Sequence, residues 1–409
     1  MSSPAPENVV IVGAGIIGVS TAYYLSLLSP STKIYIVEAS PVLFSSASGK
    51  AAGFLARDWF SKASASLGEL SFDLHRKLAE DHNGGREWGY SSSTAYSISD
   101  SQSTSAGKGE DWLFSGTSRA LMASGLAQKE GGAPDWLAVG REKGSAIVDM
   151  ISDASSTAQV DPLLLSQFLL RQCQARNAKL YHPATPTGVV VSSSNVLTGL
   201  TIRTADGTKT TLPCDSLILT AGVWTPRVFS TLFPTATAEL SISQLSGYSL
   251  VLRSPRWSED PYAGDKSLGS HAAFTTDTEA GFSPEIFSRA GGDIYLAGLN
   301  TTAVPVADVT ASVLPDPAEI DRLKKVARKM LGDDELEILK EGFCHRPVTN
   351  SGTPLLTSLG EDATGVSGKV WVAGGHGPWG ISMSLGTGLV LSEMMLERTP
   401  SADVSSLGL

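Results

Sequence analysis

The stretch NVVIVGAGIIGVSTAYYLSLLSPSTKIYIVEAS, Asn8 to Ser40, decides the fold of the N-terminal part of the chain. Its pattern predicts a buried strand over Val9–Val12, a tight turn, a helix over about Ile16–Leu28 and a second strand over Lys33–Val37. The order of strand, glycine turn, helix and strand is typical of an α/β fold with a parallel sheet.

Three glycines, Gly13, Gly15 and Gly18, form the pattern G-x-G-x-x-G between the first strand and the helix. The first permits a sharp turn, the second lets a pyrophosphate approach the helix N-terminus, and the third lets the helix pack on the strand. Glu38 ends the second strand, where its carboxylate can accept hydrogen bonds from ribose hydroxyls. We therefore predict a dinucleotide site, for FAD or NAD, rather than a packing turn.

Composition narrows the class of protein. The chain has 409 residues, a formal net charge of −10 and no block of Lys or Arg, which argues against nucleic acid and anionic membranes as partners. No segment is long and apolar enough for us to expect a transmembrane helix, and protein partners are left open.

Three scattered cysteines favour neither a disulfide framework nor a metal site, so we expect a reducing compartment, the cytoplasm. We interpret the sequon at Asn300–Thr302 as ordinary surface.

Later segments extend the same pattern. The small-residue loop at Ser45–Phe60 follows Glu38 and could lie against a ligand, although composition alone equally suits a surface loop. Asp161 is the expected N-cap of a helix, and Leu217–Thr220 is an expected buried strand. Residues 241–299 are expected to be mostly antiparallel strands.

These elements predict an α/β domain assembled from separated segments, with β-rich insertions between them. The expected dinucleotide-binding domain comprises residues 1–85, 150–235 and 340–409. The expected substrate domain comprises residues 86–149 and 236–339.

The chain as a whole resembles the FAD-dependent oxidoreductases of the D-amino acid oxidase, glycine oxidase and sarcosine oxidase type. The resemblance rests on VVIVGAGIIGVSTAYYL with Glu38, KAAGFL, the VDP helix start, LILTAGVWT, HRPVTNSGTPLL and AGGHGPWGISMSLGTG. It is strongest for a fungal branch of oxidoreductases of unassigned substrate. It implies FAD as the cofactor, a doubly wound Rossmann-like FAD-binding domain, and a second α+β substrate domain built on an antiparallel sheet.

The resemblance also implies which residues contact FAD. They are Gly13, Gly15, Ile16, Ile17, Gly18, Glu38, Ala39, Ser48, Lys50, Ala51, Ala52, Gly53, Phe54, Leu55, Ala221, Gly222, Trp224, Cys344, Gly375, His376, Gly377, Pro378, Trp379, Gly380 and Ile381. In the family the last loop passes beneath the flavin, so its glycines would let backbone amides reach the ring, and a helix starting near Ile381 would direct its positive end there. Pro378 and Trp379 would fix the loop and form a wall of the flavin site.

Two residues are candidates for catalysis. In the family's amino acid oxidases an arginine in the matching R-P holds the substrate carboxylate, and Arg346 stands there; a structural ion pair is the alternative. His376 is either a proton-transfer residue or a ring fixed by packing.

Three positions determine how far the chemistry of the family can be expected in this chain. Cys344 matches the cysteine joined to the flavin in sarcosine and fructosyl amine oxidases, but we expect a buried thiol and non-covalent FAD. Tyr295 stands where sarcosine oxidases have an oxygen-activating lysine, which leaves the electron acceptor open. Pro186 stands where a backbone N–H is expected to meet the adenine, and proline has none.

The resulting functional prediction is an FAD-dependent oxidoreductase that oxidises the C–N bond of a small amine or amino acid by hydride transfer to flavin. Two alternatives remain. A flavoprotein with mainly an interaction or trafficking role would keep the FAD motifs, and an NAD-linked dehydrogenase would share the first motif but would not need the C-terminal glycine loop.

Overall fold

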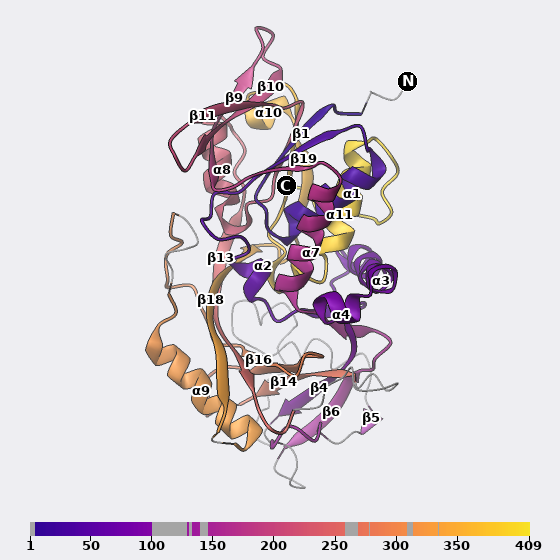
Figure 1. Ribbon diagram of the computed structural model, residues 1–409, viewed down its shortest axis with the longest axis vertical. Helices are drawn as coiled ribbons and strands as arrows, with labels where there is room; N and C mark the ends of the chain where they lie inside the picture. The colour runs from indigo at the N-terminus through magenta and orange to yellow at the C-terminus, as the bar shows by residue number, and fades with distance from the viewer. Residues whose placement is uncertain are drawn as a thin grey trace.

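The computed structural model describes residues 5–99, 129–130, 133–139, 146–257, 269–277, 279–308, 314–333 and 335–409. The molecule is elongated, with one large sheet in each half and a small sheet in the upper half (Figure 1). Much of the expected substrate domain between residues 100 and 145 lies outside the described residues. The domain boundaries given above stay a prediction.

The upper half of Figure 1 contains a six-stranded sheet with the order β19-β20-β12-β1-β2-β8. Its strands are β1 (Asn8–Val12), β2 (Lys33–Val37), β8 (Lys179–Tyr181), β12 (Ser216–Leu219), β19 (Leu355–Leu359) and β20 (Lys369–Gly374). All neighbours are parallel except β19, which runs antiparallel to β20. The strand, helix and strand predicted from Asn8–Ser40 are confirmed.

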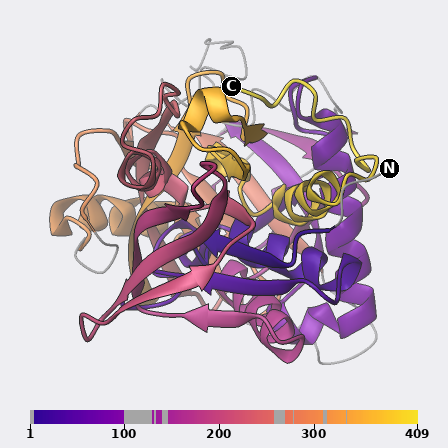
Figure 2. The same cartoon turned by 90° about the horizontal axis from the view of Figure 1, so that it is seen from above.

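The sheet is buried on both faces, which explains the continuous apolar run VVIV in β1. Val9 and Ile11 pack into a core with α1 (Ile16–Leu28), α3 (Ala65–His82), α7 (Pro162–Ala175) and α11 (Ser384–Met395). Val10 and Val12 pack into a second core on the other face. That face is covered by α8 (Thr225–Leu232) and by the small sheet β9 (Ala184–Val191), β10 (Leu197–Thr204) and β11 (Lys209–Pro213) (Figure 2). The doubly wound arrangement is therefore confirmed.

The lower half is built on an 11-stranded sheet among the described residues. Its main strands are β4 (Ser91–Ser99), β5 (Lys129–Glu130), β6 (Ile147–Ser152), β13 (Ile242–Arg253), β14 (Ser270–Thr276), β15 (Glu285–Ser288), β16 (Ile294–Ala297), β17 (Asn300–Thr301) and β18 (Glu337–Thr349). Neighbours are antiparallel apart from β4 and β14, which are parallel. Helix α9 (Pro317–Leu331) packs against this sheet. The predicted antiparallel second sheet is confirmed.

Local capping follows the sequence closely. The Asp161 carboxylate accepts hydrogen bonds from the amides of Leu163 and Leu164 at 2.9 and 3.0 Å, so it caps α7 as predicted. The helix expected near Ile381 begins later, at Ser384, because the 3₁₀ helix η3 (Gly377–Trp379) and a turn come first.

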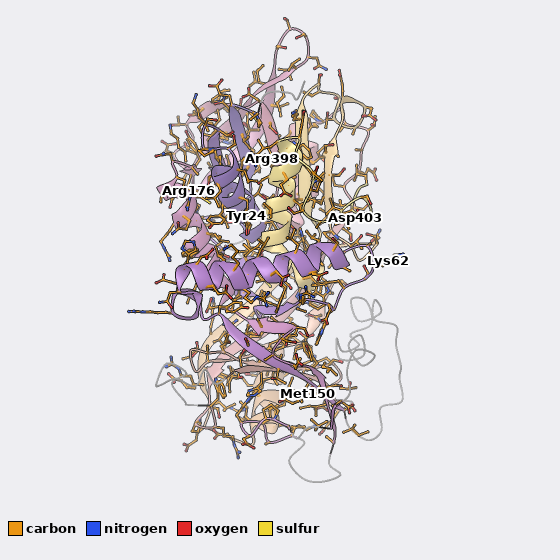
Figure 3. All side chains as sticks on the ribbon, turned by 90° about the vertical axis from the view of Figure 1, so that its right-hand side faces the viewer. Tyr24, Lys62, Met150, Arg176, Arg398 and Asp403 are labelled. Carbon is orange, nitrogen blue, oxygen red and sulfur yellow. The ribbon has the colours of Figure 1, made fainter. Side chains whose placement is uncertain are left out.

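Two features join the halves. Helix α3 runs across the middle of the molecule (Figure 3), and the long strands β13 and β18 extend along its side (Figure 1). Cys344 and Arg346 lie on β18. Within the described parts of the chain, no helix is both long and apolar enough to cross a membrane.

Candidate functional site

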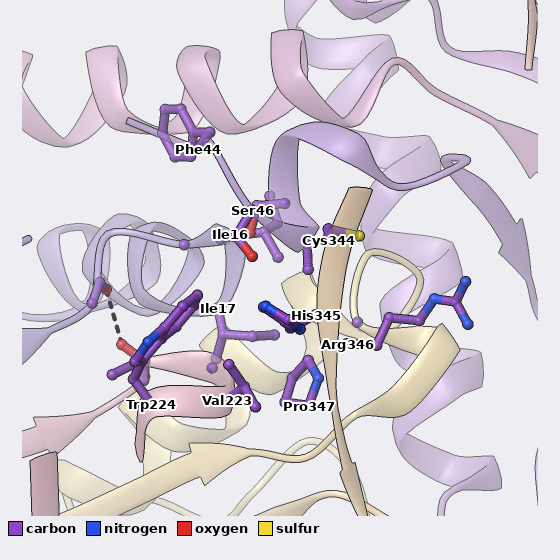
Figure 4. A pocket seen from close by; sticks show the side chains of 18 of the residues that line it. Ile16, Ile17, Phe44, Ser46, Val223, Trp224, Cys344, His345, Arg346 and Pro347 are labelled. Atoms are coloured by element: carbon purple, nitrogen blue, oxygen red, sulfur yellow. Dashed lines mark hydrogen bonds between the residues drawn. The ribbon is translucent and has the colours of Figure 1, made fainter. Parts of the chain in front are cut away.

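A cavity of about 460 Å³ lies where β1, β2 and β12 end and where β18 crosses from the other sheet (Figure 4). Val12, Val37 and Thr220 line it from the carboxyl ends of these three parallel strands. Ligands of open α/β sheets bind at this edge. The cavity is thus in the position expected for a dinucleotide.

Most of the predicted site residues line this cavity. They are Gly13, Gly15, Ile16, Ile17, Glu38, Ala39, Ser48, Lys50, Ala51, Ala52, Gly53, Phe54, Ala221, Gly222, Trp224, Cys344, Arg346, His376, Gly377, Pro378, Gly380 and Ile381. The chain therefore brings together four segments that are far apart in sequence.

Gly18 and Leu55 do not line the cavity, contrary to the prediction. A Cβ at Gly18 would lie 2.0 Å from the Gly13 carbonyl oxygen, so this glycine lets α1 pack on the preceding turn. Leu55 is fully buried in the strand β3 (Phe54–Ala56). Both residues lie behind residues that line the cavity.

Gly375 and Trp379 also lie outside the cavity wall. Gly375 has φ +75°, and a Cβ there would lie 2.4 Å from Thr349 Cγ2, so packing on β18 requires the glycine. The Trp379 ring packs edge-on against Phe60, with ring centroids 4.9 Å apart. The prediction that Trp379 walls the site is corrected: Pro378 and its glycine neighbours do so instead.

Glu38 organises the glycine turn. Its Oε2 accepts the Ala14 amide at 2.9 Å, and its Oε1 accepts the amide and hydroxyl of Ser40 at 2.8 and 2.6 Å. A carboxylate has about four acceptor positions, so these three bonds leave capacity for a ligand hydroxyl. At the start of α1, the Ile16 amide donates to Ser48 Oγ at 2.9 Å.

Other residues that line the cavity near the glycine turn also suit a dinucleotide. The amides of Gly15 and Ile17 lie at the N-terminus of α1, where backbone donors have no partner within the helix, and both residues line the cavity. Gly222 lines it as well, and a Cβ built there would meet no atom within 4 Å. Open space and free donors are what a pyrophosphate requires.

The loop that includes Lys50 and Ala51 is held from the other sheet. The Tyr295 hydroxyl donates to the Lys50 carbonyl at 2.9 Å, and Arg289 donates to the carbonyls of Ala51 and Ala52 at 3.1 and 2.9 Å. These contacts fix the loop as a cavity wall. Tyr295 thus has a structural partner in the cavity wall.

Arg346 reaches across β13 to β17. Its Nη2 donates to Asn300 Oδ1 at 2.8 Å. A Cβ at Gly247 would lie 2.4 Å from Nη2, so the arginine needs glycine at this position. Among the described residues, no Asp or Glu forms an ion pair with Arg346, which removes the support for the ion-pair alternative.

Cys344 is buried and lines the cavity. Burial raises the pKa of its thiol, while the nearby cations Arg346 and Lys50 act in the opposite direction. Lys50 Nζ donates to the Phe343 carbonyl at 2.9 Å, and burial lowers the pKa of Lys50. The net shift keeps Cys344 protonated at neutral pH, as an inert thiol would be.

His376 is buried, and its Nε2 lies 3.0 Å from the hydroxyl of Thr387. Burial lowers the pKa of the ring to about 4, so the ring is neutral at physiological pH. These contacts support the interpretation of His376 as a ring fixed by packing.

Sequence reasoning missed part of the cavity wall. His345 lines the cavity, and its Nδ1 lies 2.6 Å from Ser246 Oγ. Other lining residues that were not predicted include Thr185, Thr187, Arg203, Val223, Arg227, Gly247, Glu285 and Ala297. The positions of His345 and Val223 between predicted site residues were a usable signal, whereas residues such as Gly247 and Ala297 depend on how distant strands pair.

Comparisons with known proteins agree with this geometry. The family model described as FAD dependent oxidoreductase (DAO) matches residues 8–394. A Schizosaccharomyces pombe relative, named as an oxidoreductase without a stated substrate, is 25% identical and covers 98% of this chain and 97% of its own. Glycine oxidase from Geobacillus kaustophilus has a TM-score of 0.72 at 20% identity, covering 99% of both chains. Iminodiacetate oxidase from Chelativorans sp. BNC1 has a TM-score of 0.68 at 17% identity, covering 98% of both chains.

Proposed function

This chain belongs to the family of FAD-dependent oxidoreductases, and on that premise we propose that it oxidises the C–N bond of a small amino acid or amine that carries a carboxylate. The observation that carries this proposal is the guanidinium of Arg346 in the cavity wall, which forms no ion pair with any described residue and is held by the neutral amide of Asn300. The substrates named for glycine oxidase and iminodiacetate oxidase both combine an amine with a carboxylate. Family membership also replaces the NAD-linked alternative with FAD.

In the proposed arrangement the cavity residues from Glu38 to β18 would hold FAD. Glu38 would accept hydrogen bonds from the ribose, and the first turn of α1 would hold the pyrophosphate. The loops around Ala51 and Gly377 would contact the flavin. Pro186 also lines the cavity close to Glu38, and its lack of an N–H would remove one adenine contact.

When bound, FAD supplies the two-electron oxidation that no side chain of the chain provides. The proposed task of the protein is to bind and orient the substrate. Arg346 would fix the carboxylate through parallel N–H donors and so set the position of the neighbouring C–H and C–N bonds. Apolar wall residues such as Val223 and Ala297 would exclude water around the amine, which must be neutral to react.

We further propose that FAD binding is non-covalent. The burial that raises the pKa of the Cys344 thiol disfavours the thiolate that bond formation to a flavin would require. Cys344 would then pack beside the cofactor without reacting.

An anaerobic spectroscopic experiment tests the proposed reaction. The purified protein should show the absorption bands of oxidised flavin, and a reactive amino acid should bleach them. The panel pairs each carboxylate with its amide, such as glycine with glycinamide and alanine in both configurations with alaninamide. We expect bleaching only by carboxylate-bearing members, and loss of that bleaching in Arg346→Met. Bleaching by dithionite but by no amine in a broad panel would contradict the proposal.

A further inference from the structure

Asn300 begins the sequon that we interpreted as ordinary surface, but its half-buried side chain forms a hydrogen bond within the protein. Its Oδ1 accepts the hydrogen bond from Arg346 Nη2. We infer that Asn300 is a positioning residue that orients Arg346 without neutralising it, and so leaves the site selective for a carboxylate over a neutral group. The inference rests on the proposed role of Arg346 and assigns a determinant of specificity to that same site.

Strand pairing brings the three residues together. Gly247 on β13 pairs with Asn300 of β17 on one side and with Cys344 of β18 on the other, and Arg346 is two residues beyond Cys344. Cys344 and Arg346 leave β18 on the side opposite His345 (Figure 4), as alternation along a strand requires. The Arg346 side chain therefore crosses β13 over Gly247, which offers no side chain to block it.

The lack of a side chain at Gly247 leaves room for the contact between Arg346 and Asn300. A Cβ there would lie 2.4 Å from Arg346 Nη2 and 2.8 Å from Asn300 Oδ1. The glycine is thus required at the point where the two side chains meet. The sheet positions both partners before any ligand is present.

The lack of charge on the Asn300 side chain matters as much as its position. A carboxylate at position 300 would pair with the guanidinium in a charge-assisted, often bidentate contact and would compete with a substrate carboxylate. The amide oxygen of Asn300 accepts one hydrogen bond from Arg346 and carries no net charge. A guanidinium has five N–H donors, so one bond to Asn300 leaves Arg346 both charged and able to bind a ligand.

Two carboxylates of the wall, Asp308 and Glu38, have partners of their own. Asp308 accepts from Arg227 at 2.7 Å, and Glu38 accepts from the glycine turn. No carboxylate in the described part of the chain forms an ion pair with Arg346. The charge of Arg346 is therefore kept for a ligand.

Titration of the FAD-loaded protein with propionate and with its neutral isostere propionamide, followed by the flavin difference spectrum, tests the inference. Wild type should bind propionate at least about 10-fold more tightly than propionamide. Asn300→Asp should weaken propionate binding about 30-fold and change propionamide binding less than about twofold, because only the anion meets the neutralised arginine. Asn300→Ala should weaken propionate binding about fivefold, since the charge remains but its orientation is lost.

Asn350→Asp is the matched control, because it introduces the same charge at an exposed position just after β18. Its propionate affinity should equal that of wild type. If Asn300→Asp loses FAD, the inference is decided by Asn300→Ala, and wild-type propionate affinity in that variant overturns it.

Arg346→Met separates this inference from the proposed function. Weak propionate binding in Arg346→Met together with wild-type binding in Asn300→Asp would overturn the role of Asn300 and leave Arg346 as the anchor. Wild-type binding in both variants, or a wild-type protein without preference for propionate, would overturn the anchor and the inference together.

Discussion

Replacing Gly247 with alanine adds a Cβ at the point where the Arg346 and Asn300 side chains meet. The added Cβ would lie 2.4 Å from Arg346 Nη2, 2.8 Å from Asn300 Oδ1 and 3.2 Å from Arg346 Cζ. Ordinary contacts of a Cβ begin near 3.4 Å, so the guanidinium has to move by roughly 1 Å. A movement of this size breaks the 2.8 Å hydrogen bond to Asn300.

The expected loss follows from the contacts that are broken. A hydrogen bond to a charged group contributes about 1.5–3 kcal/mol, and the same displacement misaligns the donors for a substrate carboxylate. We therefore expect Gly247→Ala to weaken carboxylate binding about 10- to 100-fold. Since the glycine turn at Gly13 and the Glu38 contacts lie at other residues, FAD should stay bound in this variant.

The assay is anaerobic flavin reduction by a carboxylate-bearing substrate over a range of concentrations. It gives the apparent dissociation constant and the limiting rate of reduction separately. Gly188→Ala is the matched control, because Gly188 also lies in a strand and a Cβ there meets nothing within 4 Å. The apparent dissociation constant should rise in Gly247→Ala and stay unchanged in Gly188→Ala.

One result would refute this reasoning. If Gly247→Ala folds, retains FAD and binds the carboxylate with wild-type affinity, then the position of Arg346 over Gly247 is not the binding position. The proposed anchor would then have to be found elsewhere in the cavity wall.

Three further predictions concern Arg346, Cys344 and the buried histidines. Arg346→Lys should weaken binding of a carboxylate substrate by about 2 kcal/mol, or about 30-fold, because the charge remains but the planar fork is lost; equal binding to wild type would count against the anchor. Acid precipitation should release FAD into the supernatant from both wild type and Cys344→Ser, and yellow colour kept only in the wild-type pellet would show a covalent bond to this residue. His75 and His376 have a pKa lowered by burial from 6.5 to about 4, so between these values the unfolded chain binds protons that the native rings do not, and the free energy of unfolding should decrease as pH falls through this range. Thermal unfolding at pH 7 and pH 5 should show a smaller difference for His376→Gln than for wild type, and equal differences would argue against this origin.

The local pattern around Asn8–Ser40 was sufficient to predict a parallel α/β unit with a dinucleotide site, but the choice of FAD over NAD and the doubly wound domain came from the resemblance of the whole chain. Gly13 has φ +107°, and Gly18 packs against the Gly13 carbonyl, so the pattern reflects contacts between residues close in sequence. The cap at Asp161 could be predicted for the same reason, since its partners lie two and three residues away. Elements that depend on nearest neighbours are encoded directly in short motifs.

The C-terminal glycine loop shows where short motifs stop being informative. The motif placed the loop at the site, and Pro378 and Gly377 do line the cavity. It did not show that Gly375 packs on Thr349 or that Trp379 turns toward Phe60, because the path through η3 decides the direction of each side chain. A loop of this kind takes its path from the surfaces on which it packs.

The contact between Arg346 and Asn300 was decided only by tertiary structure. The two residues are 46 positions apart, and they meet because β17 and β18 pair with β13 on either side of Gly247. A shift of one residue in either register would send the side chains to the opposite face of the sheet. The sequence by itself determined which residue carries the charge, while strand register determined that a neutral amide holds it and that a glycine leaves room for it.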